Sequence, residues 1–306
     1  MDLRSQIPRL VEDPIAYGNR VAAVTLDGSR PVLPPGLSVE DFLILLAHLP
    51  EDAPVSPALR GVTALDLSSM ALTALPEEIG RLARLHTLNL ADNQLSTLPD
   101  SLGDLSELYG LIVWGNRLTA LPESVGRLTR LNALYAWDNK LTMLPASIGG
   151  CVALEDLNVS NNQIASLPAS VGGLRSLIWI NLWGNALTGL PDAIGAWKNL
   201  QTLCVHHNDL GTLPPAIGAL QGLEWLDAPS AKLTHLPEEV GQLRQLEGLL
   251  LGDNQLSALP ASMAGMPRLR RIDLSNNRFT QAPPVTAHLP ALTELWMLGN
   301  PIRRGR

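Results

Sequence analysis

Apolar residues recur with a fixed spacing of 23 residues from Val62 to the C-terminus. Each block begins with an apolar residue, and further apolar residues stand at positions 4, 6 and 11, as in Leu85, Leu88, Leu90 and Leu95. The alternation around positions 4 and 6 is typical of a short strand with one buried face. We therefore expect eleven blocks, the last one truncated, to stack as one elongated repeat domain over residues 62–306.

Two polar or rigid positions complete each block. Position 9 is asparagine in nine of the eleven blocks: Asn93, Asn116, Asn139, Asn162, Asn185, Asn208, Asn254, Asn277 and Asn300. An amide side chain both donates and accepts, so stacked asparagines can satisfy buried backbone groups of their own turn and of the neighbouring turn. Position 15 is proline in all ten complete blocks, from Pro76 to Pro283, where a short helical turn can begin. Each block thus predicts a strand, a turn, a short helix and a return to the core.

This block predicts an α/β fold: a curved solenoid or horseshoe, with a parallel sheet on the concave face and short helical segments on the convex face. The stretch Leu75-Pro-Glu-Glu-Ile-Gly-Arg-Leu82 resembles the 23-residue class of leucine-rich repeat proteins. That class includes Ras-binding scaffold proteins, plant intracellular Ras-group-related proteins and many bacterial proteins. The resemblance covers residues 62–306 and implies a surface for binding macromolecules. Some bacterial relatives carry a ubiquitin-ligase domain after the repeats, an activity we do not transfer to this protein.

The two ends of the sequence depart from the block. Residues 1–61 predict a divergent N-terminal cap with a strand near 21–26 and a helix near 39–49, where Ser38-Val-Glu-Asp41 has the form of a capping box. Residues 1–20 are alternatively a protein-binding extension. At the other end no clear cap follows the last strand. The last repeat is therefore expected to be exposed and to fray, or alternatively to pair with another molecule. We favour a monomer.

Two blocks lack the asparagine at position 9 and carry Met70 and Ala231 instead. For Ala231, within Ala228-Pro-Ser-Ala231, one interpretation is simple drift of the repeat. The other is a local change of curvature that exposes backbone groups to a ligand.

Composition and charge exclude several classes of function. The formal net charge is -7 and the isoelectric point about 5.4, and no basic stripe is present, so we expect no nucleic-acid partner. No segment approaches the roughly 20 apolar residues that span a bilayer, and no cleavable signal is visible, so we expect no membrane partner and a cytoplasmic location. Delivery into a host cell stays open. Cys151 and Cys204 occupy nonequivalent positions three blocks apart, too far for a disulfide.

The tryptophans concentrate on one predicted face. Side chains at positions 3, 5, 7 and 8 are expected to face the concave side, because those at 4 and 6 enter the core. Six of the seven tryptophans fall in these columns: Trp114, Trp137, Trp179, Trp183, Trp225 and Trp296. Trp197, at position 21, is expected in the core. Such exposed indoles are typical of binding surfaces, although neighbouring rings that pack on one another and cover the sheet would explain them too.

Carboxylates share these columns: Asp66, Asp92, Asp138, Asp156, Asp227, Asp253, Asp273 and Glu294, against one base, Arg271. Tryptophan faces beside carboxylates suit a lysine or arginine side chain, whereas a solvated acidic face would simply follow the overall charge. The residues predicted to bind a partner are Trp114, Tyr135, Trp137, Asp138, Asp156, Trp179, Trp183, His206, Trp225 and Asp227.

These features predict a nonenzymatic protein-interaction module that binds a protein or peptide, with a basic segment as one option, on its concave face. Alternatives are a carbohydrate-binding protein that uses the tryptophans and a bacterial effector that acts by binding host proteins. We predict no catalytic residue, cofactor or metal. His206, His207 and Asp209 lack a convergent third ligand, and Cys204 has no base at catalytic spacing.

Overall fold

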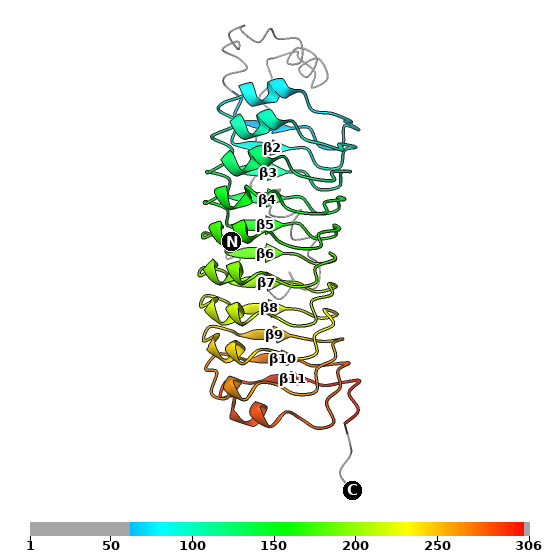
Figure 1. The fold of residues 1–306 in the computed structure, drawn as a ribbon, viewed down its shortest axis with the longest axis vertical. Helices are drawn as coiled ribbons and strands as arrows, with labels where there is room; N and C mark the ends of the chain where they lie inside the picture. The colour runs from blue at the N-terminus through cyan, green and yellow to red at the C-terminus, as the bar shows by residue number, and fades with distance from the viewer. Residues whose placement is uncertain (1–61, 303–306) are drawn as a thin grey trace.

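A parallel sheet runs the whole length of the molecule. The computed structural model describes residues 62–302 and contains one eleven-stranded sheet in which the strands follow one another in sequence order (Figure 1). The strands are β1 Ala64–Asp66, β2 Thr87–Asn89, β3 Gly110–Ile112, β4 Ala133–Tyr135, β5 Asp156–Asn158, β6 Trp179–Asn181, β7 Thr202–Cys204, β8 Trp225–Asp227, β9 Gly248–Leu250, β10 Arg271–Asp273 and β11 Glu294–Trp296. The predicted solenoid of parallel strands is confirmed. The expected strand and helix of the N-terminal cap lie outside the described residues.

The register between strands repeats the sequence period. Leu65 pairs with Leu88, and Leu88 pairs with Leu111, each 23 residues further along the sequence. Because the pairing has no slip, every position of the block forms a straight column across the sheet. Reading the columns from the sequence therefore assigns each side chain to the correct face.

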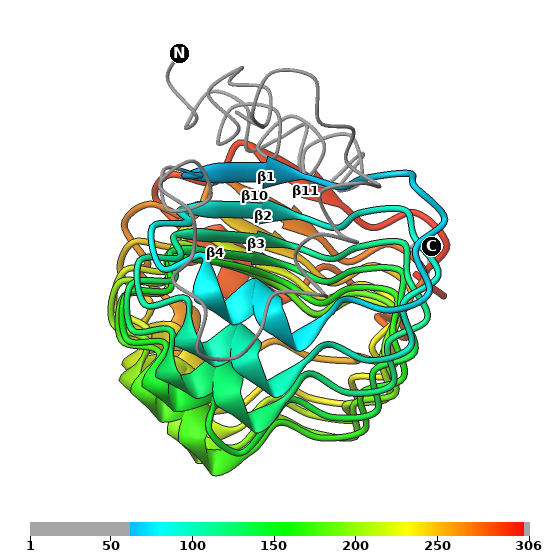
Figure 2. The same cartoon turned by 90° about the horizontal axis from the view of Figure 1, so that it is seen from above.

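The helical segments are short 3₁₀ helices on the side of the coil opposite the strands (Figure 2). They are η2 Glu77–Arg81, η3 Asp100–Asp104, η4 Glu123–Arg127, η5 Ile148–Gly150, η6 Ala169–Gly173, η7 Asp192–Ala196, η8 Pro215–Ala219, η9 Glu238–Gln242, η10 Ala261–Met263 and η11 Pro284–His288. Most begin directly after the proline at position 15, as Pro99 precedes η3 with an extended backbone. This confirms the predicted role of that proline. Within the described residues, no helix is both long and apolar enough to cross a membrane.

Glycine at position 19 lets successive 3₁₀ helices approach closely. A Cβ atom placed on Gly103 would overlap the backbone oxygen of Ser124 in the next repeat, and one on Gly126 would overlap that of Ser147. The side opposite the sheet is therefore packed backbone against backbone at this column.

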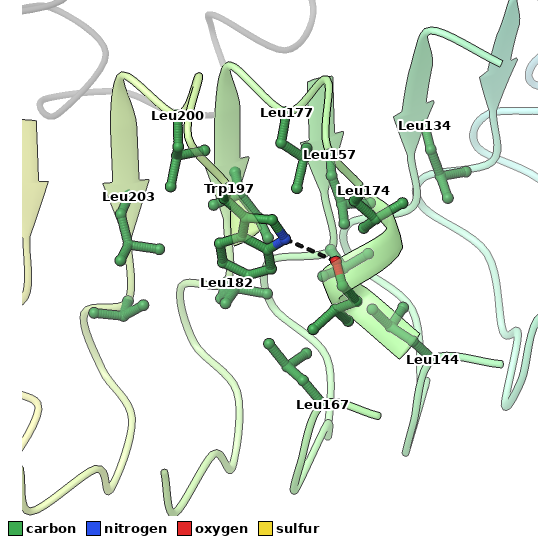
Figure 3. Close-up of a cluster of buried hydrophobic side chains, with 14 of the residues drawn as sticks. Leu134, Leu144, Leu157, Leu167, Leu174, Leu177, Leu182, Trp197, Leu200 and Leu203 are labelled. Atoms are coloured by element: carbon green, nitrogen blue, oxygen red, sulfur yellow. Dashed lines mark hydrogen bonds between the residues drawn. The ribbon is translucent and has the colours of Figure 1, made fainter. Parts of the chain in front are cut away.

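Leucines fill the space between the sheet and the 3₁₀ helices. The residues at positions 1, 4 and 6 of the second block, Leu85, Leu88 and Leu90, are all fully buried. Position 21 is leucine in most blocks, but Trp197 occupies it in the sixth. Trp197 is also fully buried, and its Nε1 donates to the Val171 carbonyl at 2.8 Å (Figure 3). The core assignment of this tryptophan is confirmed.

The asparagine ladder joins each turn to the previous one. Asn116 Nδ2 donates to the carbonyls of Leu90, Val113 and Trp114 at 2.9, 3.0 and 3.2 Å, and its Oδ1 accepts the Leu95 N–H at 3.0 Å. One amide thus satisfies backbone groups in two repeats, as predicted. Most of these asparagines are buried, so their bonds form away from water.

The repeat with Ala231 keeps its backbone satisfied without its own asparagine. Ala231 is buried, and its N–H donates to Asn254 Oδ1 of the next repeat at 3.1 Å. Its carbonyl accepts the N–H groups of Leu210 and Gly211 at 3.1 and 3.3 Å. The idea that this break exposes backbone to a ligand is therefore wrong, and drift of the repeat describes it.

The last described layer is more open than the others. Leu292, Leu295 and Met297 occupy positions 1, 4 and 6 but are only partly buried. Leu298 is 85 % exposed and Trp296 44 % exposed. The expected exposure of this layer is confirmed.

Candidate functional site

We define the concave face as the surface formed by side chains at positions 3, 5, 7 and 8 of each block, on the opposite side of the sheet from the leucine core. The ten residues predicted to bind a partner lie in six successive repeats, 3 to 8, either in the strands or in the turns after them. Straight columns bring them together, because equivalent positions of adjacent repeats lie one strand apart, at about 4.8 Å.

Aromatic side chains form an apolar cluster on this face that is separate from the leucine core. Its buried members are Ala91, Ile112, Ala133, Tyr135, Trp137 and Trp179, with Trp114 packed against them. The rings of Trp114 and Trp137 are stacked with centroids 5.2 Å apart and planes 7° apart. Tyr135 meets Trp137 edge to face at 5.8 Å and 62°. Both geometries are favourable for aromatic pairs.

The exposure of the tryptophans differs from the expectation. Trp137 is 2 % exposed, Trp179 6 % and Trp225 9 %, so the expectation that these three indoles stand in water was wrong. Trp114 and Trp183 are half-buried. Stacking of Trp114 on Trp137 accounts for part of the burial of Trp137, as the alternative of neighbouring rings that pack on one another predicts. Among the tryptophans of the concave face in repeats 3 to 8, Trp114 and Trp183 are therefore the accessible ones.

Trp225 lies against a glycine that the sequence pattern does not single out. A Cβ atom on Gly248, its partner in β9, would overlap the six-membered ring of Trp225. The indole thus lies flat across the neighbouring strand. A small residue beside a tryptophan in the same column is the signal that could have revealed this contact.

Trp183 belongs to a second aromatic group, at the ends of the strands. Its ring centroid lies 5.6 Å from that of His206 and 6.4 Å from that of His207. His206 is half-buried, whereas His207 is exposed. From the sequence, His207 is considered only as a candidate metal ligand. The sequence does not predict that His207 packs in a group with Trp183 and His206.

The carboxylates of the predicted site differ in environment. Asp138 and Asp156 are half-buried, and Asp227 is 1 % exposed. Burial, with the neighbouring Glu155 charge, raises the pKa of Asp156 from 3.8 to about 6, although a hydrogen bond from Tyr135 opposes the shift. Burial, Glu155 and Asp156 also raise the pKa of Tyr109. Negative charge is therefore concentrated beside the aromatic cluster.

Replacement of Asp156 by asparagine is expected to stabilise the protein near pH 7.5. The folded-state pKa is raised, so the contribution of Asp156 is most favourable below about pH 4 and is lost as the pH rises through about 6. The difference between the pKa of Asp156 in the folded protein and its ordinary value corresponds to about 3 kcal/mol of free energy of unfolding. Partial exposure of the side chain to water reduces this amount. We expect D156N to raise the free energy of unfolding by about 1–2 kcal/mol at pH 7.5 and by less at pH 5.

Urea unfolding at the two pH values measures this effect. Asp92→Asn, at an exposed carboxylate on the same face, is the matched control and should change little. A destabilised D156N at pH 7.5 would contradict the assigned environment of Asp156.

The cysteines and possible metal ligands of the described residues were candidates for other chemistry. Burial and the charge of Asp227 raise the pKa of the Cys204 thiol well above its ordinary value, which keeps it protonated and weakly nucleophilic. Cys151 and Cys204 are both free and buried. Residues 62–302 contain no group of three or more histidine, cysteine or acidic side chains able to hold a metal ion.

Comparisons with known proteins give a consistent family match. A model described as a leucine-rich repeat region matches residues 59–141, and models of the leucine-rich repeat match residues 199–220, 221–279 and 244–302. No curated protein sequence matches this protein.

Three solved structures illustrate the similarity. The LRR protein LIC12759 of Leptospira interrogans is 28 % identical, with a TM-score of 0.63, over 86 % of this protein and 81 % of that one. YopM, a leucine-rich effector protein from Yersinia pestis, is 27 % identical with a TM-score of 0.62, over 79 % and 62 %. The ectodomain of the Arabidopsis thaliana receptor kinase GASSHO1/SCHENGEN3, in complex with CASPARIAN STRIP INTEGRITY FACTOR 2, is 28 % identical with a TM-score of 0.62, over 77 % and 35 %.

Proposed function

Because the molecule is a leucine-rich repeat protein, we propose that it is a nonenzymatic interaction module that binds a peptide or protein segment on the concave face of repeats 3 to 8. The single observation that carries the proposal is the aromatic cluster outside the core, with its stacked Trp114 and Trp137. A solvated face needs no such apolar cluster, whereas aromatic side chains supply much of the affinity of protein interfaces.

Charge indicates the chemistry of the partner. Asp138 and Asp156 lie on the same face as the cluster, and ionisation of Asp156 is disfavoured in the free protein. A lysine or arginine side chain would favour the ionised carboxylate and could stack on an indole, which combines ion pairing with cation-π attraction. A basic segment is therefore the partner we propose.

Several structural neighbours support a peptide or protein as the ligand. The receptor kinase ectodomain and the PEPR1 structure were each solved with a bound partner, CASPARIAN STRIP INTEGRITY FACTOR 2 and AtPEP1, and Toll with Spatzle. This protein is 26–28 % identical to these proteins and spans 30–36 % of their lengths. The extension of their mode of action to this protein is part of the proposal.

The test is a selection of random peptides displayed on phage, followed by calorimetry with the selected peptides. We expect peptides rich in lysine and arginine, and we expect the double variant Trp114→Ala with Trp183→Ala to bind them at least about tenfold more weakly, because two accessible anchors are lost. Trp296→Ala is the matched control, since Trp296 lies on the same face but in the last strand and is 44 % exposed.

Equal affinity of the double variant and the wild type would overturn the proposal. So would a selection without basic enrichment combined with binding of oligosaccharides on a glycan array, which would assign the tryptophans to carbohydrate binding. Circular dichroism of both variants establishes that the fold is retained before affinities are compared.

A further inference from the structure

The aspartate of repeat 8 is freed from a structural task that its counterparts perform. Asparagine or aspartate at position 5 usually accepts the backbone N–H of position 7. This bond is 3.0 Å from Ser68 to Asp66, 3.0 Å from Ala91 to Asn89, 3.1 Å from Ser160 to Asn158, 2.9 Å from Trp183 to Asn181 and 2.8 Å from Ser275 to Asp273. In repeat 8 position 7 is Pro229, which has no N–H. Asp227 therefore cannot form the bond.

Asp227 instead faces a histidine of the preceding repeat. Both of its carboxylate oxygens are buried, and no backbone N–H reaches them. Oδ2 lies 2.9 Å from Nδ1 of His206, a close contact between the two groups in which a ring N–H is not aligned for a hydrogen bond. An ionised carboxylate in such a place is costly unless a cation or a donor faces it. Two side chains next to Asp227 can supply a proton, the Cys204 thiol and the His206 imidazole. We infer that Nδ1 of His206 carries a proton and that a small rotation of the ring aligns it with Asp227, as in other carboxylate-histidine pairs. Asp227 then acts as a positioning residue for His206.

The pair fixes one ring of the group formed by Trp183, His206 and His207. The two imidazole centroids are 5.6 Å apart, and both lie within 6.4 Å of the Trp183 ring. His207 is exposed and the His206 side chain retains 13 % exposure. Two imidazoles with accessible edges thus stand beside a half-buried indole at the ends of β6 and β7.

These imidazoles are unusual on an acidic face. Apart from them, the described residues at positions 3, 5, 7 and 8 include one cationic side chain, Arg271, which donates to Glu294 at 2.9 Å. His206 and His207 are therefore the imidazole donors that these columns offer to a negative group on a ligand. The ring of His206 can face Asp227 through Nδ1 and such a group through its opposite edge at Nε2.

We propose that His206 and His207 form a binding site for a carboxylate of the partner, beside Trp183, with Asp227 and Pro229 setting the orientation of His206. The carboxylate is that of an acidic residue or of a free peptide terminus. This goes beyond the basic-segment proposal, because it adds a second, oppositely charged contact that fixes the direction in which a ligand lies across the repeats. It rests on the proposed function only in taking the ligand to be a peptide.

Nuclear magnetic resonance of protein labelled with nitrogen-15 histidine tests the proposal without a known partner. The probes are acetyl-Ala-Glu-Ala-amide, acetyl-Ala-Ala-Ala with a free carboxylate, and the neutral acetyl-Ala-Gln-Ala-amide. We expect Nδ1 of His206 to be protonated, and one or both carboxylate peptides, but not the neutral one, to shift the imidazole signals of His206 and His207. The responding peptide identifies the source of the carboxylate.

Variants separate positioning from general structure. His206→Gln should remove the response, and Asp227→Asn should weaken it at least about fivefold and change the tautomer signature of His206. Pro229→Ala restores the missing N–H and should draw Asp227 back to the turn, with the same change in His206. His235→Gln, at an exposed histidine bonded to Thr212 and Thr234, is the control and should leave the response intact.

Three results would overturn the proposal: an equal response to the neutral peptide, no response to any probe, or an unchanged His206 signature in Asp227→Asn. Each is independent of the basic-segment proposal. Phage-selected basic peptides that still require Trp114 and Trp183 would then leave the proposed function standing while the carboxylate site fails.

Discussion

Asn254→Ala is expected to lower the free energy of unfolding by about 3–5 kcal/mol, since buried groups left without partners cost about 1–3 kcal/mol each. Asn254 Nδ2 donates to the carbonyls of Ala228, Leu251 and Gly252 at 2.8, 3.0 and 3.1 Å. Its Oδ1 accepts two N–H groups, from Ala231 at 3.1 Å and Leu233 at 2.8 Å. Asn254 therefore serves the turn of repeat 8 as well as its own.

Chemical unfolding measured by circular dichroism checks this expectation. Gln163→Ala, at an exposed position directly after Asn162 in the ladder, provides the control and should cost less than about 0.5 kcal/mol. Asn116→Ala should cost less than Asn254→Ala, because its Oδ1 accepts a bond from Leu95 alone. An Asn254→Ala variant as stable as the control would show that the ladder does not hold the turns together.

Trp197→Ala is expected to cost about 4–5 kcal/mol, at the upper end for loss of a buried aromatic side chain. The ring is fully buried between repeats, and its removal leaves both a large cavity and the Val171 carbonyl without the Nε1 donor at 2.8 Å. Both losses fall in the leucine core, where the surrounding backbone is fixed by the sheet and the 3₁₀ helices.

Urea unfolding of a small series separates the two losses. Trp197→Phe keeps most of the ring volume and should recover all but about 1–2 kcal/mol, the share of the hydrogen bond and the smaller ring. Trp296→Ala removes a tryptophan that is 44 % exposed and should cost about 1 kcal/mol or less. Equal costs for Trp197→Ala and Trp296→Ala would contradict the assignment of one ring to the core and the other to the surface.

The fold could be predicted from the sequence because each repeated position has one structural task. The asparagines at position 9 bond two turns, the prolines at position 15 precede the 3₁₀ helices, and Trp197 at position 21 enters the core. Each task depends on contacts within one repeat or between that repeat and the one next to it. A strict 23-residue register preserves those contacts along the whole sheet.

The details of the concave face could be predicted only in part, because they depend on how large side chains lean across strands. The columns place Trp137 and Trp225 on the correct face, and adjacent tryptophans in one column make the stacking of Trp114 on Trp137 one of the two interpretations. They do not show that Trp225 lies over Gly248. By its column alone, Asp227 is one more surface carboxylate. Its missing bond to the turn follows from Pro229, two positions further on, and becomes visible only when the bonds of the equivalent residues are compared.

The unbroken register also sets fixed distances between the side chains that a ligand would contact. Trp114 and Trp183 occupy the same column three strands apart, a separation of about 14 Å at about 4.8 Å per strand. An extended peptide advances about 3.4 Å per residue, so two side chains four residues apart in such a peptide would match these two indoles. His206 lies one strand further, which places its contact one or two residues beyond. The order of basic and acidic residues in a selected peptide would then reveal the direction in which it crosses the sheet.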